Sequence, residues 1–262
     1  TYPKCGTTWM TQILHALRTG GSLDFGEITE VVPWDILAQQ CGQCLDDEQV
    51  ARPRAFKSHE AWEHIAKGAR YIYVARDPQD AFFSFYVFLT AYMGLEPGDL
   101  EPEDFCDAIF AGTSMSGQIW HHFLGWYRAR RRADVLWLFF EDLKEDLERE
   151  VARIAEWLGI TLSEAERREV VRVSSYGFMS AAENAHHFDD HFVRGHVLPR
   201  MGLPADLSSR VSKVRSGGGK VGSRSKLPSV VRARLDSQWE RILKAETGFA
   251  SYGELRAALR AA

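Results

Sequence analysis

Two short apolar runs, each followed directly by a helical signal, constrain the fold most strongly. They are Tyr71–Ala75 and Val135–Phe140, and continuous runs rich in β-forming residues are typical of strands buried on both faces of a parallel sheet. After the first run, Asp77 suits a helix N-cap, Pro78 suits the first helical position, and Asp80 places a carboxylate in the first turn. Strands that alternate with helices predict an α/β fold with a central, mostly parallel sheet flanked by helices.

The spacing of apolar residues predicts further helices and leaves two stretches without a period. The helices are expected at residues 8–18, 114–132, 147–158, 228–243 and 252–259. Gly177–Arg210 and Val214–Lys226 lack regular order. We interpret the first as an irregular, mobile lid over an acceptor site. The alternative, a metal site, is less favoured because its histidines at 186, 187, 191 and 196 match no standard zinc spacing.

Composition excludes several classes of protein. The chain has 262 residues and a net charge of −4, which does not fit a strongly basic nucleic-acid-binding protein. No stretch approaches the 18 consecutive apolar residues that a membrane span needs. The cysteines at 5, 41, 44 and 106 are too few for a disulfide scaffold. We interpret Cys41-Gly-Gln-Cys44 as reduced thiols rather than a redox or zinc site, and the features together predict a cytoplasmic protein.

The stretch Thr1–Trp9 (TYPKCGTTW) comes directly before a helical segment. A glycine followed by two threonines at a helix start offers backbone N–H groups, hydroxyls and the positive end of the helix dipole to a phosphate. Lys4 adds a positive charge. The pattern differs from the G-x4-G-K-[ST] loop because the lysine precedes the glycine. Taken alone, the short K-x-G-T-T pattern would also suit a capped helix with a solvated lysine.

The full string resembles the 5′-phosphosulfate-binding loop of the cytosolic type of sulfotransferase, with Cys5 in place of the usual serine. These enzymes depend on PAPS (3′-phosphoadenosine 5′-phosphosulfate). Other segments resemble the family's motifs in the same order: Lys57–His59, Tyr73–Pro78 with Ser84, Leu138–Lys144, Ser174–Met179 and Arg215–Gly217. In the last of these, a serine replaces the family's lysine and the following Trp-Lys pair is missing. The resemblance implies a P-loop-nucleotide-kinase-like sulfotransferase fold in a single domain over residues 1–262.

The resemblance also implies roles for individual residues. His59 is the general base, Lys57 lies near the transferring sulfuryl oxygens, and Lys4 lies near the bridging oxygen of the leaving group. An imidazole suits the base because it titrates near neutrality, and in an extended segment Lys57 and His59 point to the same side. The cofactor-binding residues are Lys4, Cys5, Gly6, Thr7 and Thr8 at the 5′-phosphate, Trp9, Ser174 and Tyr176 near adenine, and Arg76, Ser84, Arg215, Ser216 and Gly217 at the 3′-phosphate.

The predicted function is therefore sulfuryl transfer from PAPS to a hydroxyl of a small-molecule acceptor, without a metal. The alternatives are a P-loop-like nucleotide kinase, which would depend on Mg²⁺, and a catalytically inactive module that binds PAP or PAPS. Aromatic residues between 82 and 92 fit a core helix, some of them lining an apolar acceptor pocket. We expect no nucleic-acid partner, and no dimer motif of the family indicates a homo-oligomer. The loop begins at residue 1 although such a loop follows a strand, so we expect the first strand to be missing through N-terminal truncation.

Overall fold

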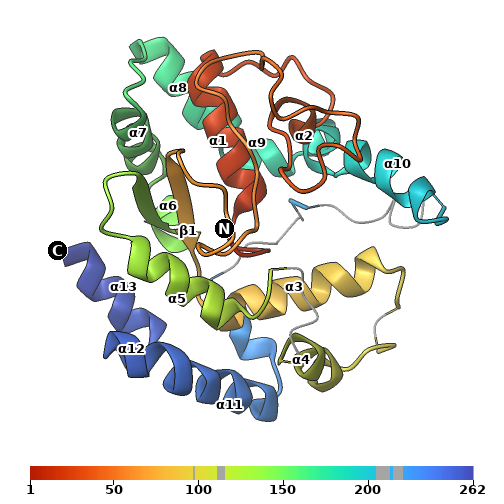
Figure 1. Cartoon of the computed structure of the whole chain (residues 1–262), viewed down its shortest axis with the longest axis vertical. Helices are drawn as coiled ribbons and strands as arrows, with labels where there is room; N and C mark the ends of the chain where they lie inside the picture. The colour runs from red at the N-terminus through yellow and green to blue at the C-terminus, as the bar shows by residue number, and fades with distance from the viewer. Residues whose placement is uncertain (97, 111–115, 205–212, 215–220, 262) are drawn as a thin grey trace.

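A computed structural model describes residues 1–96, 98–110, 116–204, 213–214 and 221–261 of the chain. At its centre lie strands β1 (Tyr71–Ala75) and β2 (Val135–Phe139), which pair in parallel along their whole length (Figure 1). Within the described residues the sheet consists of these two strands. Because the strands run in register, their carboxyl ends lie at the same edge. The predicted α/β class with a parallel sheet is confirmed.

Helical segments surround the sheet and account for most of the described chain. Their bounds are α1 (Thr7–Thr19), α2 (Ile28–Val31), α3 (Pro78–Tyr92), α4 (Pro102–Phe110), α5 (Ile119–Ala129), α6 (Phe140–Glu145), α7 (Leu147–Leu158), α8 (Glu164–Val173), α9 (Tyr176–Ser180), η1 (Ala182–Phe188), α10 (His191–Arg200), η2 (Ser223–Lys226), α11 (Ser229–Gln238), η3 (Trp239–Lys244), α12 (Ala245–Thr247) and α13 (Tyr252–Ala261).

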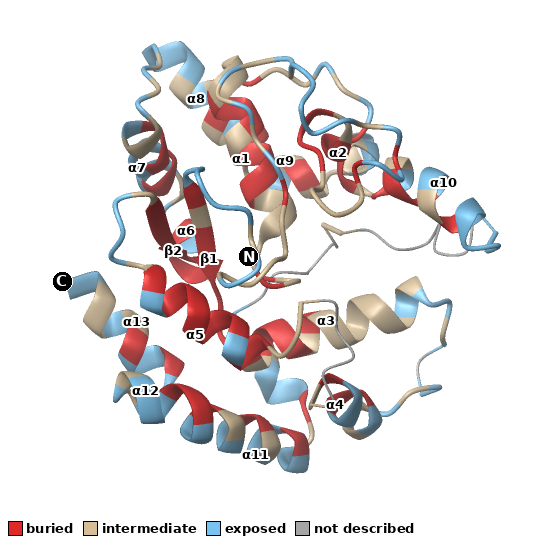
Figure 2. Ribbon diagram, viewed as in Figure 1, coloured by how far each residue is buried: buried red, intermediate tan, exposed pale blue. Residues whose placement is uncertain are grey.

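Both faces of the sheet are covered, and the side chains of each strand alternate between them. Tyr73 and Trp137 belong to an aromatic-rich cluster with α3, α4, α5 and α11. Val74 and Leu138 point to the other face, where they pack with α1, α7 and α8. Figure 2 shows the result, with both strands buried between the helices. Each large apolar side chain buried in this way stabilises the fold by roughly 1.5–3 kcal/mol.

Helix α3 starts as the sequence predicts, and its first turn fixes a distant segment. The Asp77 carboxylate accepts a hydrogen bond from a first-turn backbone N–H (2.9 Å), and Pro78 is the first helical residue. Asp80 is buried and accepts hydrogen bonds from the backbone N–H groups of Gly222 (2.7 Å) and Arg224 (2.8 Å). The first turn of α3 therefore holds the chain where it approaches the C-terminal helices.

Several predicted boundaries shift. The helix expected at 114–132 spans Ile119–Ala129, because Gly117 adopts a left-handed φ of +64° and Gln118 is extended. Phe140 is the first residue of α6 rather than the last of β2. The helix expected at 228–243 appears as α11 followed by the π-helical turn η3.

The prediction of an irregular stretch at Gly177–Arg210 is wrong for its described part. The segments α9, η1 and α10 make it mostly helical through residue 200. Its buried apolar side chains are Met179, Phe188, Val193 and Leu198. Their uneven spacing hides the helical period, and packing against α2 and its neighbours supplies the order that local sequence does not.

Two further observations concern the surface and the thiols. No helix in the described ranges is both long enough and apolar enough to cross a bilayer. All four cysteines are free thiols, with Cys44 exposed and Cys41 buried.

Candidate active site

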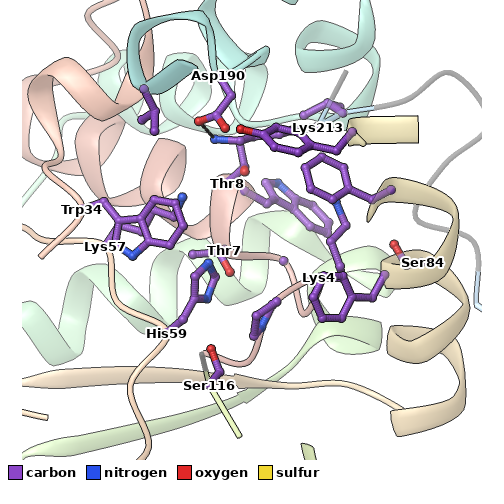
Figure 3. A pocket seen from close by; sticks show the side chains of 18 of the residues that line it. Lys4, Thr7, Thr8, Trp34, Lys57, His59, Ser84, Ser116, Asp190 and Lys213 are labelled. Atoms are coloured by element: carbon purple, nitrogen blue, oxygen red, sulfur yellow. Dashed lines mark hydrogen bonds and ion pairs between the residues drawn. The ribbon is translucent and has the colours of Figure 1, made fainter. Parts of the chain in front are cut away.

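A cavity of about 480 Å³ opens at the carboxyl edge of the sheet (Figure 3). Its size is in the range of small-molecule sites in proteins. It is lined by the N-terminal turn, the end of β1, the start of α6 and the segment around residue 58. The predicted site residues that line it are Lys4, Gly6, Thr7, Thr8, Trp9, Lys57, His59, Arg76, Ser84 and Tyr176. Residues far apart in the sequence thus meet at one place.

The turn before α1 has the backbone geometry of an anion-binding loop. Lys4 and Gly6 both have left-handed φ values, +65° and +94°. Gly6 is required for a second reason, because a Cβ there would lie 3.0 Å from the ring of Phe140. Gly6 also provides no side-chain cap to α1, so no N-cap side chain occupies the first-turn N–H groups, and Thr7 and Thr8 of that turn line the cavity. Such successive N–H groups form a concavity for an anion.

Cys5 contributes to this turn through its backbone. Its side chain is 2 % exposed, packs in the core and does not line the cavity. Burial raises the pKa of the Cys5 thiol to about 12. The thiol is therefore neutral at pH 7.

The end of β1 brings a buried cation to the cavity wall. Arg76 is 4 % exposed and donates a hydrogen bond to the Lys4 carbonyl (2.6 Å), while its guanidinium lies 4.4 Å from the ring centre of Phe140. Ser84 lines the same cavity from α3. A second cation, Lys144, also lines the cavity, and burial together with Arg76 lowers its pKa. Arg76 is buried and Lys144 is exposed, and two cations gathered at one cavity favour an anionic ligand through charge-assisted hydrogen bonds.

The segment at 57–59 presents a cation and an imidazole together. Lys57 forms an isolated parallel bridge with Trp34, so the backbone is extended, and both Lys57 and His59 line the cavity as expected. His59 Nδ1 lies 2.8 Å from the Thr1 carbonyl. Because a carbonyl only accepts, Nδ1 carries the hydrogen and Nε2 carries the lone pair. Burial and the nearby Lys57 hold the pKa of His59 well below 6.5, so the ring is neutral at pH 7.

A second histidine, His122 on α5, holds this segment in place. Its Nε2 donates to the His59 carbonyl (3.2 Å), and its Nδ1 lies 3.4 Å from the Tyr73 hydroxyl on β1. The side chain is 1 % exposed, and burial lowers the pKa of His122 to about 3. Sequence reasoning missed this residue, because nothing in its local pattern marks a histidine that binds a distant carbonyl.

Four charged side chains lie close together at one wall of the cavity, and Lys57, Asp190 and Lys213 line it. Lys57 lies 3.6 Å from the ring centre of Trp34, and Lys213 forms an ion pair with Asp190. Burial, followed by the charge of Lys213, lowers the pKa of Lys57. Glu27 is fully buried beside them. Sequence reasoning singled out Lys57 alone, since the other three belong to none of the motifs that it identified.

The remaining wall is apolar and comes mainly from α3 and α10. The expectation that some aromatic residues of α3 line a pocket is confirmed for Phe85 and Tyr92, whereas Phe82 is buried in the core. The apolar lining residues on these two helices are Phe85, Phe88, Leu89, Tyr92, Val193 and Val197.

The residues expected near adenine occupy different positions. Trp9 Nε1 donates to the Ser174 carbonyl (2.6 Å), and the Trp9 ring packs edge-on to Phe140. Ser174 is completely buried and does not line the cavity; its contact with the site residues is the hydrogen bond that its carbonyl accepts from Trp9. Tyr176 lines the cavity, with the Lys144 ammonium 5.5 Å from its ring centre. The predicted 3′-phosphate residues Arg215, Ser216 and Gly217 lie outside the described residues.

The histidines of the segment after Gly177 are dispersed. His186 and His187 lie against each other, whereas His191 contacts the Asp189 carboxylate (2.7 Å). In the part of the chain that the structure describes, no group of three or more His, Cys, Asp and Glu side chains could hold a metal ion.

Two solved structures with similar folds are complexes with PAP. Mouse sulfotransferase SULT7A1, complexed with PAP, superposes with a TM-score of 0.66 at 19 % identity, over 100 % of this chain and 87 % of that chain. Retinol dehydratase, in complex with androsterone and PAP, gives 0.69 at 17 % identity over 93 % of this chain and 79 % of that chain. At these identities the likeness concerns the fold.

Sequence comparison identifies the family. Rat sulfotransferase 1A1 is 30 % identical over 187 residues, which are 67 % of this chain and 64 % of the relative. Rabbit amine sulfotransferase is also 30 % identical, over 71 % of this chain and 64 % of the relative. The chain thus spans slightly less than two thirds of the length of these relatives. The model of the sulfotransferase domain matches residues 1–195, and the chain belongs to the sulfotransferase domain family.

Proposed function

We propose that the protein transfers a sulfuryl group from PAPS to a hydroxyl of a small-molecule acceptor. The observation that carries this proposal is the single cavity in which an anion-binding turn and the buried Arg76 meet the Lys57–His59 pair. Family membership supports PAPS as the donor. The residues present also fit such a donor, because the left-handed turn suits one phosphate and the cations at the end of β1 suit another.

The transfer breaks one S–O bond and forms another. The bond between sulfur and the phosphate oxygen of the donor breaks, with its electron pair going to the leaving phosphate, and a bond between sulfur and the acceptor oxygen forms. His59 takes the hydroxyl proton on Nε2, and such proton removal typically accelerates a reaction by ~10²–10⁴-fold. Lys57 lies beside the sulfuryl oxygens and Lys4 beside the leaving oxygen, where positive charge stabilises the transition state. The products are PAP and a sulfate ester.

The apolar wall indicates the kind of acceptor. An acceptor whose hydroxyl reaches His59 would lie against α3 and α10, whose side chains there are aromatic or aliphatic. We therefore propose an apolar small molecule with a hydroxyl at one end. Trp34 also lines the cavity. A cytoplasmic location accords with the four free thiols.

A turnover screen tests the proposal. The purified chain is incubated with ³⁵S-labelled PAPS and a panel of phenols, steroids and long-chain alcohols, with ATP and Mg²⁺ as the donor in a parallel series. Labelled ester from PAPS, absent in His59→Ala while that variant still binds PAP, is the expected result. Phosphate transfer from ATP would identify a kinase instead. Tight PAP binding without transfer to any acceptor would identify an inactive binding module.

A further inference from the structure

The wall of the cavity that carries Lys57 holds more charge than the transfer chemistry described so far uses. Glu27, Lys57, Asp190 and Lys213 come from four separate segments; the first three are buried, and the Lys213 side chain is 10 % exposed. Figure 3 shows Asp190 meeting Lys213 beside Thr8, with Lys57 next to Trp34. Three of the four, Lys57, Asp190 and Lys213, line the cavity itself.

Lys213 is held firmly at this wall. Its ammonium contacts the Asp190 carboxylate, and the two side chains are 10 % and 8 % exposed. Burial alone would lower the pKa of Lys213, but the charges of Asp190 and Glu27 outweigh it and the net direction is upward. The next residue, Val214, packs with the apolar cluster of α2 and α9. Lys213 is therefore a fixed cation rather than a solvated side chain.

Two ammonium groups close together are unfavourable unless negative charge lies between or beside them. Lys213 is near enough to Lys57 to be the largest charge acting on it. In the cavity, Asp190 offsets Lys213, and Glu27 is close to both lysines. One Glu27 oxygen accepts from the Thr29 hydroxyl (3.1 Å), whereas the other has no hydrogen-bond partner within the described residues. Two lysines on a cavity wall, with the Asp190 carboxylate beside them and Glu27 behind the lining, form a site that an additional anion in the cavity can join.

We propose that Lys213 is a second cation of the transfer site, which binds the sulfuryl oxygens of the donor together with Lys57, and that Asp190 is its positioning residue. The inference rests on the proposed function. During transfer Lys213 stays protonated and donates to sulfuryl oxygens that gain charge as sulfur moves from the phosphate oxygen to the acceptor oxygen. The acceptor proton still goes to His59. Nothing in the local sequence around Lys213 marks this role.

The competing explanation is structural, since the Lys213–Asp190 pair also fastens residues 213–214 to α10. PAP and PAPS separate the two explanations, because only PAPS carries a sulfuryl group. A lone Lys213→Met change would leave the Asp190 carboxylate buried without its partner, which is strongly destabilising. The test variant is therefore the double substitution Lys213→Met with Asp190→Asn, which removes both charges. Lys244→Met, at an exposed lysine outside the cavity, is the matched control.

Binding of PAP and of PAPS without acceptor is measured by calorimetry for the full chain and both variants, followed by turnover. A charge-assisted hydrogen bond lost from the donor should weaken PAPS binding by about 10- to 100-fold in the double variant. PAP binding should stay within about twofold, kcat should fall, and the control should match the wild type. Equal weakening of PAP and PAPS, or no change in either, would overturn the role of Lys213. A wild-type chain that binds neither ligand would overturn the proposed function as well.

Discussion

Replacing His122 by glutamine should reduce the loss of unfolding free energy that the protein undergoes as the pH falls below 6.5. His122 is 1 % exposed between α5 and β1, and its Nε2–H donates to the His59 carbonyl. Burial lowers its pKa from 6.5 to about 3. The folded state therefore keeps the ring neutral, whereas the unfolded chain takes up a proton below pH 6.5. The stability linked to this group is complete above pH 6.5 and is lost as the pH falls toward 3.

The size of the effect follows from the gap between the two pKa values. Each pH unit between 6.5 and about 3 costs about 1.4 kcal/mol of unfolding free energy through this one group. At pH 4.5 the loss is therefore about 2.7 kcal/mol. This is a large fraction of the 5–15 kcal/mol or so that stabilises a typical domain. Glutamine keeps an N–H donor near the Nε2 position and has no titrating group.

The assay is urea unfolding followed by tryptophan fluorescence at half-unit steps from pH 7.5 to 4.5. The absolute stability of His122→Gln will differ from that of the wild type because packing changes. The informative quantity is the unfolding free energy of the wild type minus that of the variant. This difference should fall by about 2.7 kcal/mol between pH 7 and 4.5. His121→Gln, at an exposed neighbour on the same helix, is the matched control. Parallel curves for wild type and His122→Gln would refute the assignment of a buried, neutral imidazole.

Three further outcomes are expected. Gly6→Ala forces a Cβ onto a backbone with φ of +94°, so PAP binding should weaken at least tenfold in calorimetry, with a stability loss of roughly 1–2 kcal/mol. Burial and Lys213 lower the pKa of Lys57 to about 7, and its proposed role requires the charged form, so kcat/KM should fall as the pH rises above about 7. In kcat the same decline should lie at higher pH, because bound donor would favour the ammonium. Asp80→Asn should lower the urea midpoint, with a loss of roughly 1–3 kcal/mol in unfolding free energy, because the carboxylate accepts hydrogen bonds from the backbone N–H groups of Gly222 and Arg224. An unchanged midpoint would show that these hydrogen bonds contribute nothing to stability.

The sequence predicts the centre of the fold well, because the elements there carry strong local signals. Both strands are continuous apolar runs, and the Asp-Pro pair at the start of α3 fixes the cap that the structure contains. The start of α5 could not be placed, since a left-handed Gly117 decides it and the apolar period continues across that point. The helices after Gly177 were missed because burial of a few unevenly spaced side chains orders them.

The candidate site likewise contains some residues that the sequence predicts and others that it does not. Residues within contiguous motifs, such as Lys4, Lys57 and Arg76, were predicted and line the cavity. The role of each of them remains a prediction for the experiments above. His122 and the Asp190–Lys213 pair join segments far apart in the chain. Such contacts follow from tertiary packing, and no local sequence pattern indicates them.

The position of two indole rings at the cavity should allow the intrinsic tryptophan fluorescence of the protein to report ligand binding. Of the chain's eight tryptophans, Trp9 and Trp34 line the cavity. The Lys57 ammonium lies 3.6 Å from the ring centre of Trp34, and Trp9 sits at the start of the helix that carries the anion-binding turn. Indole emission responds to nearby charge and to contact with a purine ring. Arrival of an adenine nucleotide should therefore alter the intrinsic fluorescence, so that rapid mixing can time donor binding and product departure without a label.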